Sequence, residues 1–276
     1  MKKTIALLFI ISLVFSLQAR SLKILAIGNS FSEDAIEQNL WELGAASGDT
    51  LVIGMMYIGG SALEAHYNNL VNNADTYSYR KIVQGVKTTT EHFRLIPAIE
   101  DEDWDVIAFQ QVSSLSGKIE TFFPYLTNLI ALIRPHVKNP GVRFGLQTTW
   151  AYAQNSTHEG FANFNHNQME MFNAIVVTMN MAAKEAAIDV VIPSGTAIQN
   201  GRTSFLGDTF CRDGFHLDLK YGRYTAACTW YEALLQKQVT GNTYIPEGVS
   251  PDQAEVAQKA AHFAVENPLV ITALDR

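Results

Sequence analysis

The 276-residue chain has little cysteine and little charge, and both shortages narrow the range of protein classes. It contains two cysteines, which excludes a disulfide-rich scaffold and a zinc site built mainly from cysteines. Charged residues make up 17% of the chain, and acidic residues outnumber basic ones to give a formal net charge of −7. Because nucleic-acid-binding proteins normally carry a basic surface, this balance argues against a nucleic-acid partner.

Several motifs that indicate particular chemistries are also missing. The sequence has no Gly-x-Gly-x-x-Gly segment and no phosphate-binding loop, which argues against a nucleotide ligand. It has no His-Glu-x-x-His, EF-hand loop or Cys-x-x-Cys pair, so we expect no metal and no cofactor. Gly-x-Ser-x-Gly is missing as well, which excludes the nucleophile elbow of the α/β-hydrolases.

The N-terminal segment has the pattern of an export signal. Two lysines precede an apolar run over residues 5–17, and Ala19 then offers a small residue for cleavage. We therefore expect a signal peptide over residues 1–19 and a periplasmic or secreted protein, with no membrane span after cleavage. Export would permit a disulfide between Cys211 and Cys228, but the apolar helical surroundings of Cys228 favour two buried thiols.

Residues 20–276 alternate short apolar runs with helical patterns, and we expect them to form a single domain. The expected strands cover residues 22–27, 50–58, 104–110, 142–148 and 188–193. The expected helices begin with one capped by Ser32 and continue over residues 122–133, 164–187, 221–236 and 251–265. This alternation predicts a three-layer α/β/α sandwich with a five-stranded, mainly parallel sheet. Residues 64–103 lack clear periodicity, so we expect an insertion there with short helices.

Unusual residues follow several of the expected strands. Ligands of parallel sheets bind beyond the carboxyl ends of the strands, so these positions are where a site is expected. Ser30 follows the first strand in Gly28-Asn29-Ser30, and Asp213 and His216 follow the fifth strand three residues apart. A serine hydroxyl needs a neighbouring base to become nucleophilic, and an aspartate can orient that base. We therefore expect Ser30, His216 and Asp213 to act together.

In this order, the strand-end residues resemble the SGNH, or GDSL-like, hydrolase family over nearly the whole mature chain. The family's first motif, usually Gly-Asp-Ser, supplies the nucleophile, and here Ser30 follows Asn29 in place of the usual aspartate. A glycine after the second strand and a C-terminal Asp-x-x-His are matched by Gly60 and by Asp213 and His216. The resemblance implies a flavodoxin-like α/β fold and a Ser-His-Asp triad.

The family's third motif, Gly-x-Asn-Asp, is missing from this sequence. The resemblance implies that the backbone N–H groups of Ser30 and Gly60 and one side-chain amide would bind the oxyanion of the reaction. Gln110 and Gln111, which follow the third strand, are the available amides, and either could donate. Alternatively, both glutamines could pair with the backbone at the edge of the sheet.

The resemblance implies an exported serine esterase, and we expect a carbohydrate O-acetylesterase. Trp150 and Tyr152 follow the fourth strand, where they could stack on a sugar or anchor a loop by packing, and His66 could line the site. One alternative is an esterase for lipid or acyl substrates, a lysophospholipase or thioesterase, with Met55, Met56 and Ile58 lining an acyl channel. Another is a non-catalytic glycan-binding protein with the same fold.

Overall fold

The computed structural model describes residues 19–274, so all of the predicted signal peptide except Ala19 lies outside the described residues. The strands are β1 (Ser21–Gly28), β2 (Thr50–Tyr57), β3 (Tyr77–Val83), β4 (Val86–Phe93), β5 (Val106–Phe109), β6 (Arg143–Gln147) and β7 (Val190–Ile192). The α-helices are α1 (Ser30–Ile36), α2 (Leu40–Ala46), α3 (Leu63–Val71), α4 (Leu95–Ile99), α5 (Tyr125–Ile133), α6 (Gln168–Glu185), α7 (Ser194–Gly201), α8 (Tyr221–Leu235) and α9 (Pro251–Glu266). Four short 3-10 helices are η1 (Ser113–Leu115), η2 (Ile119–Thr121), η3 (Arg134–His136) and η4 (Glu159–Phe164).

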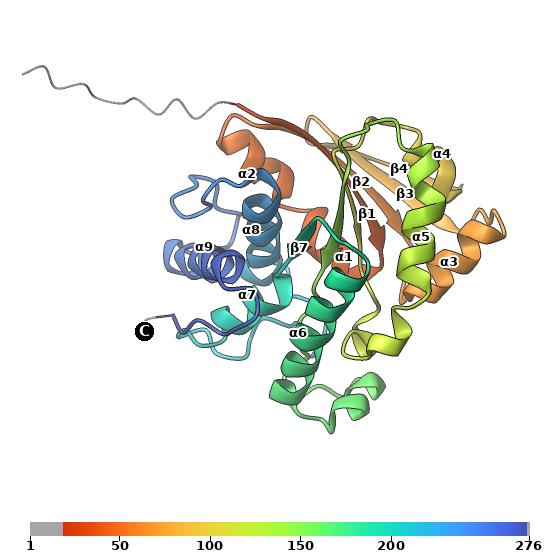
Figure 1. Cartoon of the computed structure of the whole chain (residues 1–276). Helices are drawn as coiled ribbons and strands as arrows, with labels where there is room; N and C mark the ends of the chain where they lie inside the picture. Colours follow the sequence, from red (N-terminus) through yellow and green to blue (C-terminus); the bar gives the residue numbers. More distant parts are fainter. Residues whose placement is uncertain (1–18, 275–276) are drawn as a thin grey trace, which may run out of the picture.

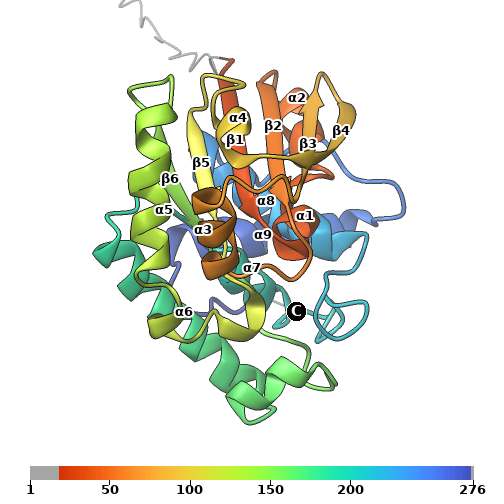
Figure 2. The same ribbon diagram turned by 90° about the vertical axis from the view of Figure 1, so that its right-hand side faces the viewer.

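The strands form one mixed sheet in the order β4-β3-β2-β1-β5-β6-β7 (Figure 2). β1 pairs in parallel with β2 and β5, and β6 pairs in parallel with β5 and β7. β3 runs antiparallel to both β2 and β4. The predicted α/β class is therefore confirmed, but the sheet has seven strands rather than five.

Helices cover both faces of the sheet, and its central strands are therefore buried on both sides. The consecutive residues Ile24, Leu25, Ala26 and Ile27 of β1 are all at most 1% exposed, although their side chains point alternately to opposite faces. Figure 1 shows α2, α8 and α9 on one side of the sheet and α3, α4 and α5 on the other. This arrangement leaves the loops at the carboxyl ends of the parallel strands free to form a site.

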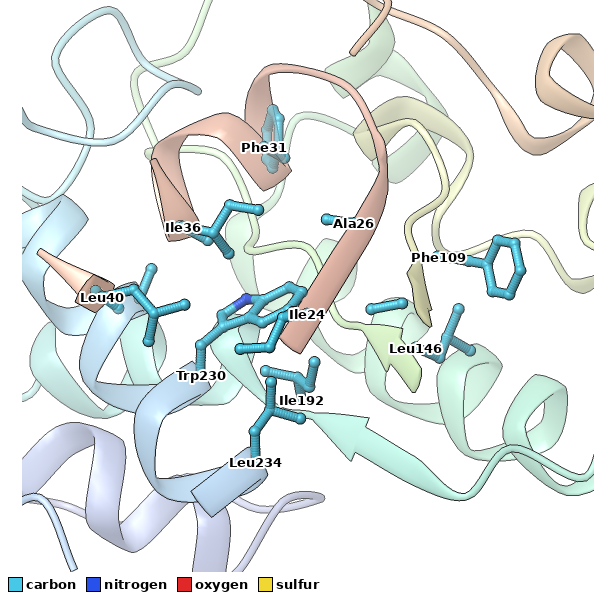
Figure 3. Close-up of a cluster of buried hydrophobic side chains, with 14 of the residues drawn as sticks. Ile24, Ala26, Phe31, Ile36, Leu40, Phe109, Leu146, Ile192, Trp230 and Leu234 are labelled. Atoms are coloured by element: carbon cyan, nitrogen blue, oxygen red, sulfur yellow. The ribbon is translucent and has the colours of Figure 1, made fainter. Parts of the chain in front are cut away.

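Helix α8 packs directly against the central strands. Figure 3 shows Trp230 of α8 beside Ile24 of β1, and Leu234 beside Ile192 of β7. These four side chains are at most 2% exposed. Burying a large apolar side chain of this kind contributes about 1.5–3 kcal/mol each, so this contact fixes the helix to the sheet.

The segment predicted as an insertion contains a hairpin as well as helices. α3 and α4 lie within it, as expected, but β3 and β4 were not predicted and extend the sheet at one edge. The hairpin turns at Gln84 and Gly85, which both have positive φ, at 52° and 76°. Nearly every residue of β4 is exposed, so this strand has no apolar run that would mark it in the sequence.

Two helix starts and the two cysteines also test the sequence predictions. Helix α9 begins with the predicted capping box, in which Ser250 and Gln253 exchange hydrogen bonds with each other's backbone. The first helix is capped by Asn29 rather than by Ser32. Both cysteines are free thiols, as predicted, but of the two only Cys228 is buried, whereas Cys211 is half-buried. Within residues 19–274, the helices are all too short or too polar to span a bilayer.

Candidate active site

Ser30 is the first residue of α1, directly after the turn that ends β1. Asn29 caps this helix, because its Oδ1 accepts a hydrogen bond from the backbone N–H of Phe31 at 3.0 Å. Gly28 allows the turn to lie close to the next strand end, since a Cβ at this position would lie 2.8 Å from Oε1 of Gln110. Ser30 is half-buried, so its hydroxyl is held at the helix start while remaining reachable from solvent.

Asp213 and His216 lie on a turn between α7 and α8. Gly214 adopts a φ of 90°, a conformation that favours glycine. The turn is closed by the backbone N–H groups of Phe215 and His216, which donate to Oδ1 of Asp213 at 3.1 and 2.7 Å. The other carboxylate oxygen, Oδ2, lies 2.7 Å from Nδ1 of the His216 ring. The turn therefore orients the ring of His216 and directs its Nε2 away from Asp213.

The structure brings Ser30, His216 and Asp213 into one hydrogen-bonded row. Nε2 of His216 lies 2.9 Å from Oγ of Ser30, although 186 positions separate the two residues in the sequence. With its proton on Nδ1, the His216 ring presents a free lone pair at Nε2 to the serine hydroxyl. The side chains of Asp213 and His216 are 41% and 21% exposed, so the row opens to solvent.

The surroundings of Asp213 keep its carboxylate charged. Partial burial by itself would raise the pKa of Asp213. The hydrogen bonds from the His216 ring and from the backbone N–H groups of His216 and Phe215 outweigh this effect and lower the pKa below its usual value. A negatively charged Asp213 can stabilise positive charge on the neighbouring imidazole.

Asn29 links the loop after β2 to the turn that carries Ser30. Its Nδ2 donates to the backbone carbonyl of Ser61 at 2.9 Å, which links the loop at Gly59 and Gly60 to the turn that carries Ser30. Gly60 has a φ of 63° and is exposed. Among the described residues, no acceptor receives the backbone N–H of Ser30 or of Gly60. Both groups are therefore available to bind an anion at the carboxyl ends of β1 and β2.

The side chains of Gln110 and Gln111 are already used in structural hydrogen bonds. Oε1 of Gln110 accepts from the backbone N–H of Asn29 at 3.1 Å, and its Nε2 donates to the carbonyl of Gln111. Oε1 of Gln111 accepts from the backbone of Leu63 at 3.0 Å, and its Nε2 donates to the carbonyl of Thr121 at 2.9 Å. Both side chains are at most 1% exposed. The prediction that one of these amides binds the oxyanion therefore does not fit the structure, whereas pairing with the backbone does.

The three candidate substrate-binding residues lie inside the protein. Trp150 and Tyr152 are 0% exposed. Trp150 stacks on Phe31 at a centroid distance of 4.3 Å and donates from Nε1 to the carbonyl of Phe215 at 2.7 Å. It thus binds the turn that carries Asp213 and His216, which matches the packing interpretation rather than contact with a sugar. His66 is also 0% exposed, and its ring bonds Tyr77 rather than lining the site.

One functional candidate, Asp34, was missed by the sequence analysis. Asp34 is a carboxylate of α1 that is 1% exposed and pairs with Arg212 and Arg223. Its position, four residues after Ser30, places it one turn further along the same helix. The available signal was a carboxylate one helical turn after the candidate nucleophile, because a carboxylate that becomes buried requires partners.

A cavity of about 1010 Å³ lies at the opposite end of the strands and is not part of this site. Arg20 and Arg143 line it, next to the starts of β1 and β6. Their guanidinium groups donate to the carbonyls of Leu235 and Leu234 at the end of α8. These cations therefore cap the helix C-terminus, where positive charge is favourable.

The fold is shared with solved structures. A crystal structure of a DUF4886 family protein from Bacteroides uniformis has 50% sequence identity and a TM-score of 0.90, covering 92% of this chain and 98% of the other. A protein from Slackia heliotrinireducens, provisionally described as an SGNH hydrolase, has 16% identity and a TM-score of 0.52, covering 78% of this chain and 99% of the other. The second similarity concerns the fold alone and places this chain among proteins of the SGNH hydrolase fold.

Among curated proteins, none matches this sequence. A family model matches residues 23–264, which include the whole sheet apart from the first two residues of β1, and every member of the Ser30, His216 and Asp213 row. Its description is "Domain of unknown function (DUF4886)". The chain belongs to the DUF4886 family.

Proposed function

We propose that this protein is a serine esterase that removes acetyl groups from carbohydrates. The observation that carries the proposal is the hydrogen-bonded row from Asp213 through His216 to Ser30, with distances of 2.7 and 2.9 Å. The row lies where parallel sheets bind their ligands, at the carboxyl ends of the strands. A non-catalytic glycan-binding protein would gain nothing from a serine hydroxyl held against a histidine nitrogen.

In the first half of the reaction, Oγ of Ser30 attacks the ester carbonyl while Nε2 of His216 takes the hydroxyl proton. The charge that develops on the carbonyl oxygen is met by the backbone N–H groups of Ser30 and Gly60. The intermediate then collapses as His216 returns the proton to the departing sugar oxygen. An acetylated Ser30 remains, and the alcohol leaves.

In the second half, His216 takes a proton from water and the resulting hydroxide attacks the acetylated Ser30. Collapse of this intermediate returns the proton to Oγ of Ser30 and releases acetate. Asp213 stays ionised throughout, which its lowered pKa favours, and it stabilises the imidazolium in both halves.

The openness of the site favours a bulky, polar alcohol over a long acyl chain. Gly59 and Gly60 are exposed in the loop that Asn29 binds through the carbonyl of Ser61, and the side chains of Asp213 and His216 are partly exposed, so a glycan can approach from solvent. The lipid-directed alternative requires Met55, Met56 and Ile58 to line an acyl channel. Met55 and Met56 are buried in β2, at 1% and 0% exposure, and pack within the hydrophobic core. Ile58 is half-buried and packs against the same core.

The esterase proposal is tested by comparing the wild-type protein with Ser30→Ala on an aryl acetate. We expect the substitution to lower kcat by roughly 10⁴-fold or more, because the nucleophile is lost. Ser113→Ala is the matched control: Ser113 also follows a strand, but its hydroxyl bonds Tyr152 at 2.8 Å. It should keep wild-type kcat. Equal activity of wild type and Ser30→Ala, or no activity on any ester, would refute the proposal.

The choice of substrate is tested on natural esters. Acetate release from acetylated oligosaccharides should exceed, in kcat/KM, the cleavage of aryl esters with acyl chains of eight or more carbons. The reverse preference would support an esterase for lipid or acyl substrates. Ser30→Ala serves as the blank in both assays, so that spontaneous hydrolysis is subtracted.

We also propose that the protein is exported through its N-terminal signal and acts in the periplasm or outside the cell. The two lysines and the apolar run over residues 5–17 support this proposal. Mass spectrometry of the protein from its native host should find a mature N-terminus at Arg20. An intact chain that retains residues 1–19 and remains in the cytoplasmic fraction would contradict it.

A further inference from the structure

The carboxylate of Asp34 is surrounded by donors from the chain segment that carries the catalytic turn. Oδ2 accepts from the backbone N–H of Leu217 at 2.8 Å, and Nη1 of Arg212 lies 3.3 Å from both carboxylate oxygens. Arg223 of α8 adds Nε at 2.8 Å and Nη2 at 2.6 Å from Oδ1. Two of these three partners flank Asp213 and His216 directly in the sequence.

These contacts close the catalytic turn at its base. Cys211 and Leu217 form an isolated antiparallel bridge, and the backbone N–H of Arg212 donates to the carbonyl of His216 at 2.9 Å. Nη1 of Arg212 also donates to the carbonyl of Leu217. Asp34 therefore binds both strands of a small closed loop, and the residues at its tip include Asp213.

Helix α1 consequently holds both halves of the catalytic row. Ser30 is the first residue of α1, and Asp34 lies one helical turn further along the same helix. Asp34 binds the backbone N–H of Leu217, at the base of the turn that carries His216. We propose that Asp34 is a positioning residue for the reaction, and that it sets the distance between Nε2 of His216 and Oγ of Ser30. This inference rests on the proposed esterase function.

A buried carboxylate with two guanidinium partners is a costly way to gain stability, because both kinds of charge lose their hydration. Apolar side chains of similar size often stabilise a core as well or better. The geometric role explains why a charge is present: only an acceptor with two oxygens can hold a backbone N–H and two guanidinium groups together. A displacement of about 1 Å in a reacting group can lower the rate by about 10²-fold, so this contact would matter for catalysis.

The chain offers a matched control in a second buried carboxylate. Asp49 precedes β2 at the other end of the sheet, its side chain is 0% exposed, and it pairs with Lys237. It also accepts the backbone N–H of Arg20 at 2.8 Å. Asp49→Asn therefore removes a charge from an equally buried ion pair, but at a distance from the catalytic row.

The experiment compares Asp34→Asn, Asp49→Asn and wild type in the full mature chain, at a temperature where near-ultraviolet circular dichroism shows all three folded. With an aryl acetate, Asp34→Asn should lower kcat by about 10²-fold and change KM by less than about threefold. Asp49→Asn should keep kcat within about threefold of wild type. Equal losses in the two variants would mean that Asp34 only stabilises the fold, and would overturn the inference.

A second measurement does not depend on esterase activity. Hydrogen–deuterium exchange followed by mass spectrometry should show faster exchange in residues 211–217 of Asp34→Asn, and unchanged exchange there in Asp49→Asn. Unchanged exchange in Asp34→Asn would overturn the inference, as would faster exchange with wild-type kcat. If instead wild type and Ser30→Ala are equally active or equally inert, the esterase proposal fails, and the exchange result alone decides whether Asp34 holds the turn.

Discussion

His66 is expected to make the protein lose stability in mild acid. Its ring is completely buried and bonds the hydroxyl of Tyr77 through Nδ1 at 3.0 Å. Nε2 is also buried, and it has no hydrogen-bond partner among the described residues. Burial disfavours the charged imidazolium and lowers the pKa of His66 from 6.5 to about 4.

The size of the loss follows from the two pKa values of His66. The unfolded chain binds a proton at His66 below pH 6.5, whereas the folded protein does so only below about pH 4. Stability from the neutral, buried ring is thus fully present above pH 6.5 and falls as the pH drops to about 4. Linkage gives a loss in the free energy of unfolding of about 1.4 kcal/mol at pH 5.5 and about 3 kcal/mol at pH 4.

The assay is urea unfolding followed by tryptophan fluorescence at pH 7, 5.5 and 4, for wild type and His66→Gln. Other acidic groups titrate in both proteins, so the difference between them isolates His66. The stability of His66→Gln relative to wild type should rise by about 3 kcal/mol between pH 7 and pH 4. Tyr77→Phe keeps the buried imidazole of His66, so its stability should follow the wild-type pH dependence. A constant difference between wild type and His66→Gln at all three pH values would refute the reasoning.

Two further predictions concern the turn that carries Ser30 and the two cysteines. Asn29→Asp introduces the residue that is usual in the Gly-Asp-Ser motif of the SGNH hydrolases, which this sequence resembles. A carboxylate cannot donate a hydrogen bond to the carbonyl of Ser61, as Nδ2 of Asn29 does at 2.9 Å. The substitution should lower the free energy of unfolding by about 1–3 kcal/mol in urea titrations, and an unchanged midpoint would contradict this role of the amide. Cys211 and Cys228 are free, so a thiol reagent should titrate two thiols in unreduced, denatured protein, and none would indicate a disulfide. In native protein Cys228 should react last, because it is completely buried.

The sheet could be predicted where its strands are buried and could not be where they are exposed. Residues 24–27 of β1 and all of β5 are continuous apolar runs because both of their faces are covered. β4 lies at the edge of the sheet with almost every side chain exposed, so its sequence is rich in threonine and carries no apolar signal. The turn at Gln84-Gly85 between two runs with β-branched residues was the available hairpin signal.

The row of Ser30, His216 and Asp213 could be predicted because the proposed chemistry requires particular residues at particular strand ends. Ser30, Asp213 and His216 follow from a motif and a spacing, and the structure brings all three together. The direction of a long side chain after a strand carries no such signal. The side-chain oxygen of Gln110 accepts a hydrogen bond from the backbone N–H of Asn29. The Nε2 of Gln110 donates to the carbonyl of Gln111, so the amide bonds the protein's own backbone rather than a ligand.

The burial of a side chain in a loop also cannot be predicted from the sequence, because it depends on which other segment covers the loop. Trp150 follows β6, where an aromatic side chain could face substrate. The segment after it is instead tied to the catalytic turn by a hydrogen bond from the backbone N–H of Ala153 to the carbonyl of Gly214 at 2.8 Å. The turn therefore closes over Trp150, whose indole bonds the carbonyl of Phe215.

The same limit applies to Asp34, and here it bears on mechanism. Its partner Leu217 is 183 positions away in the sequence, so no local pattern links them. What the sequence does contain is a carboxylate four residues after the candidate nucleophile, in a short helix whose next two residues, Ala35 and Ile36, are apolar and buried. A charge at such a position must have a partner, because an isolated buried carboxylate is too costly. Where the candidate base and the candidate nucleophile come from distant segments, the partner most worth seeking is the segment that carries the candidate base.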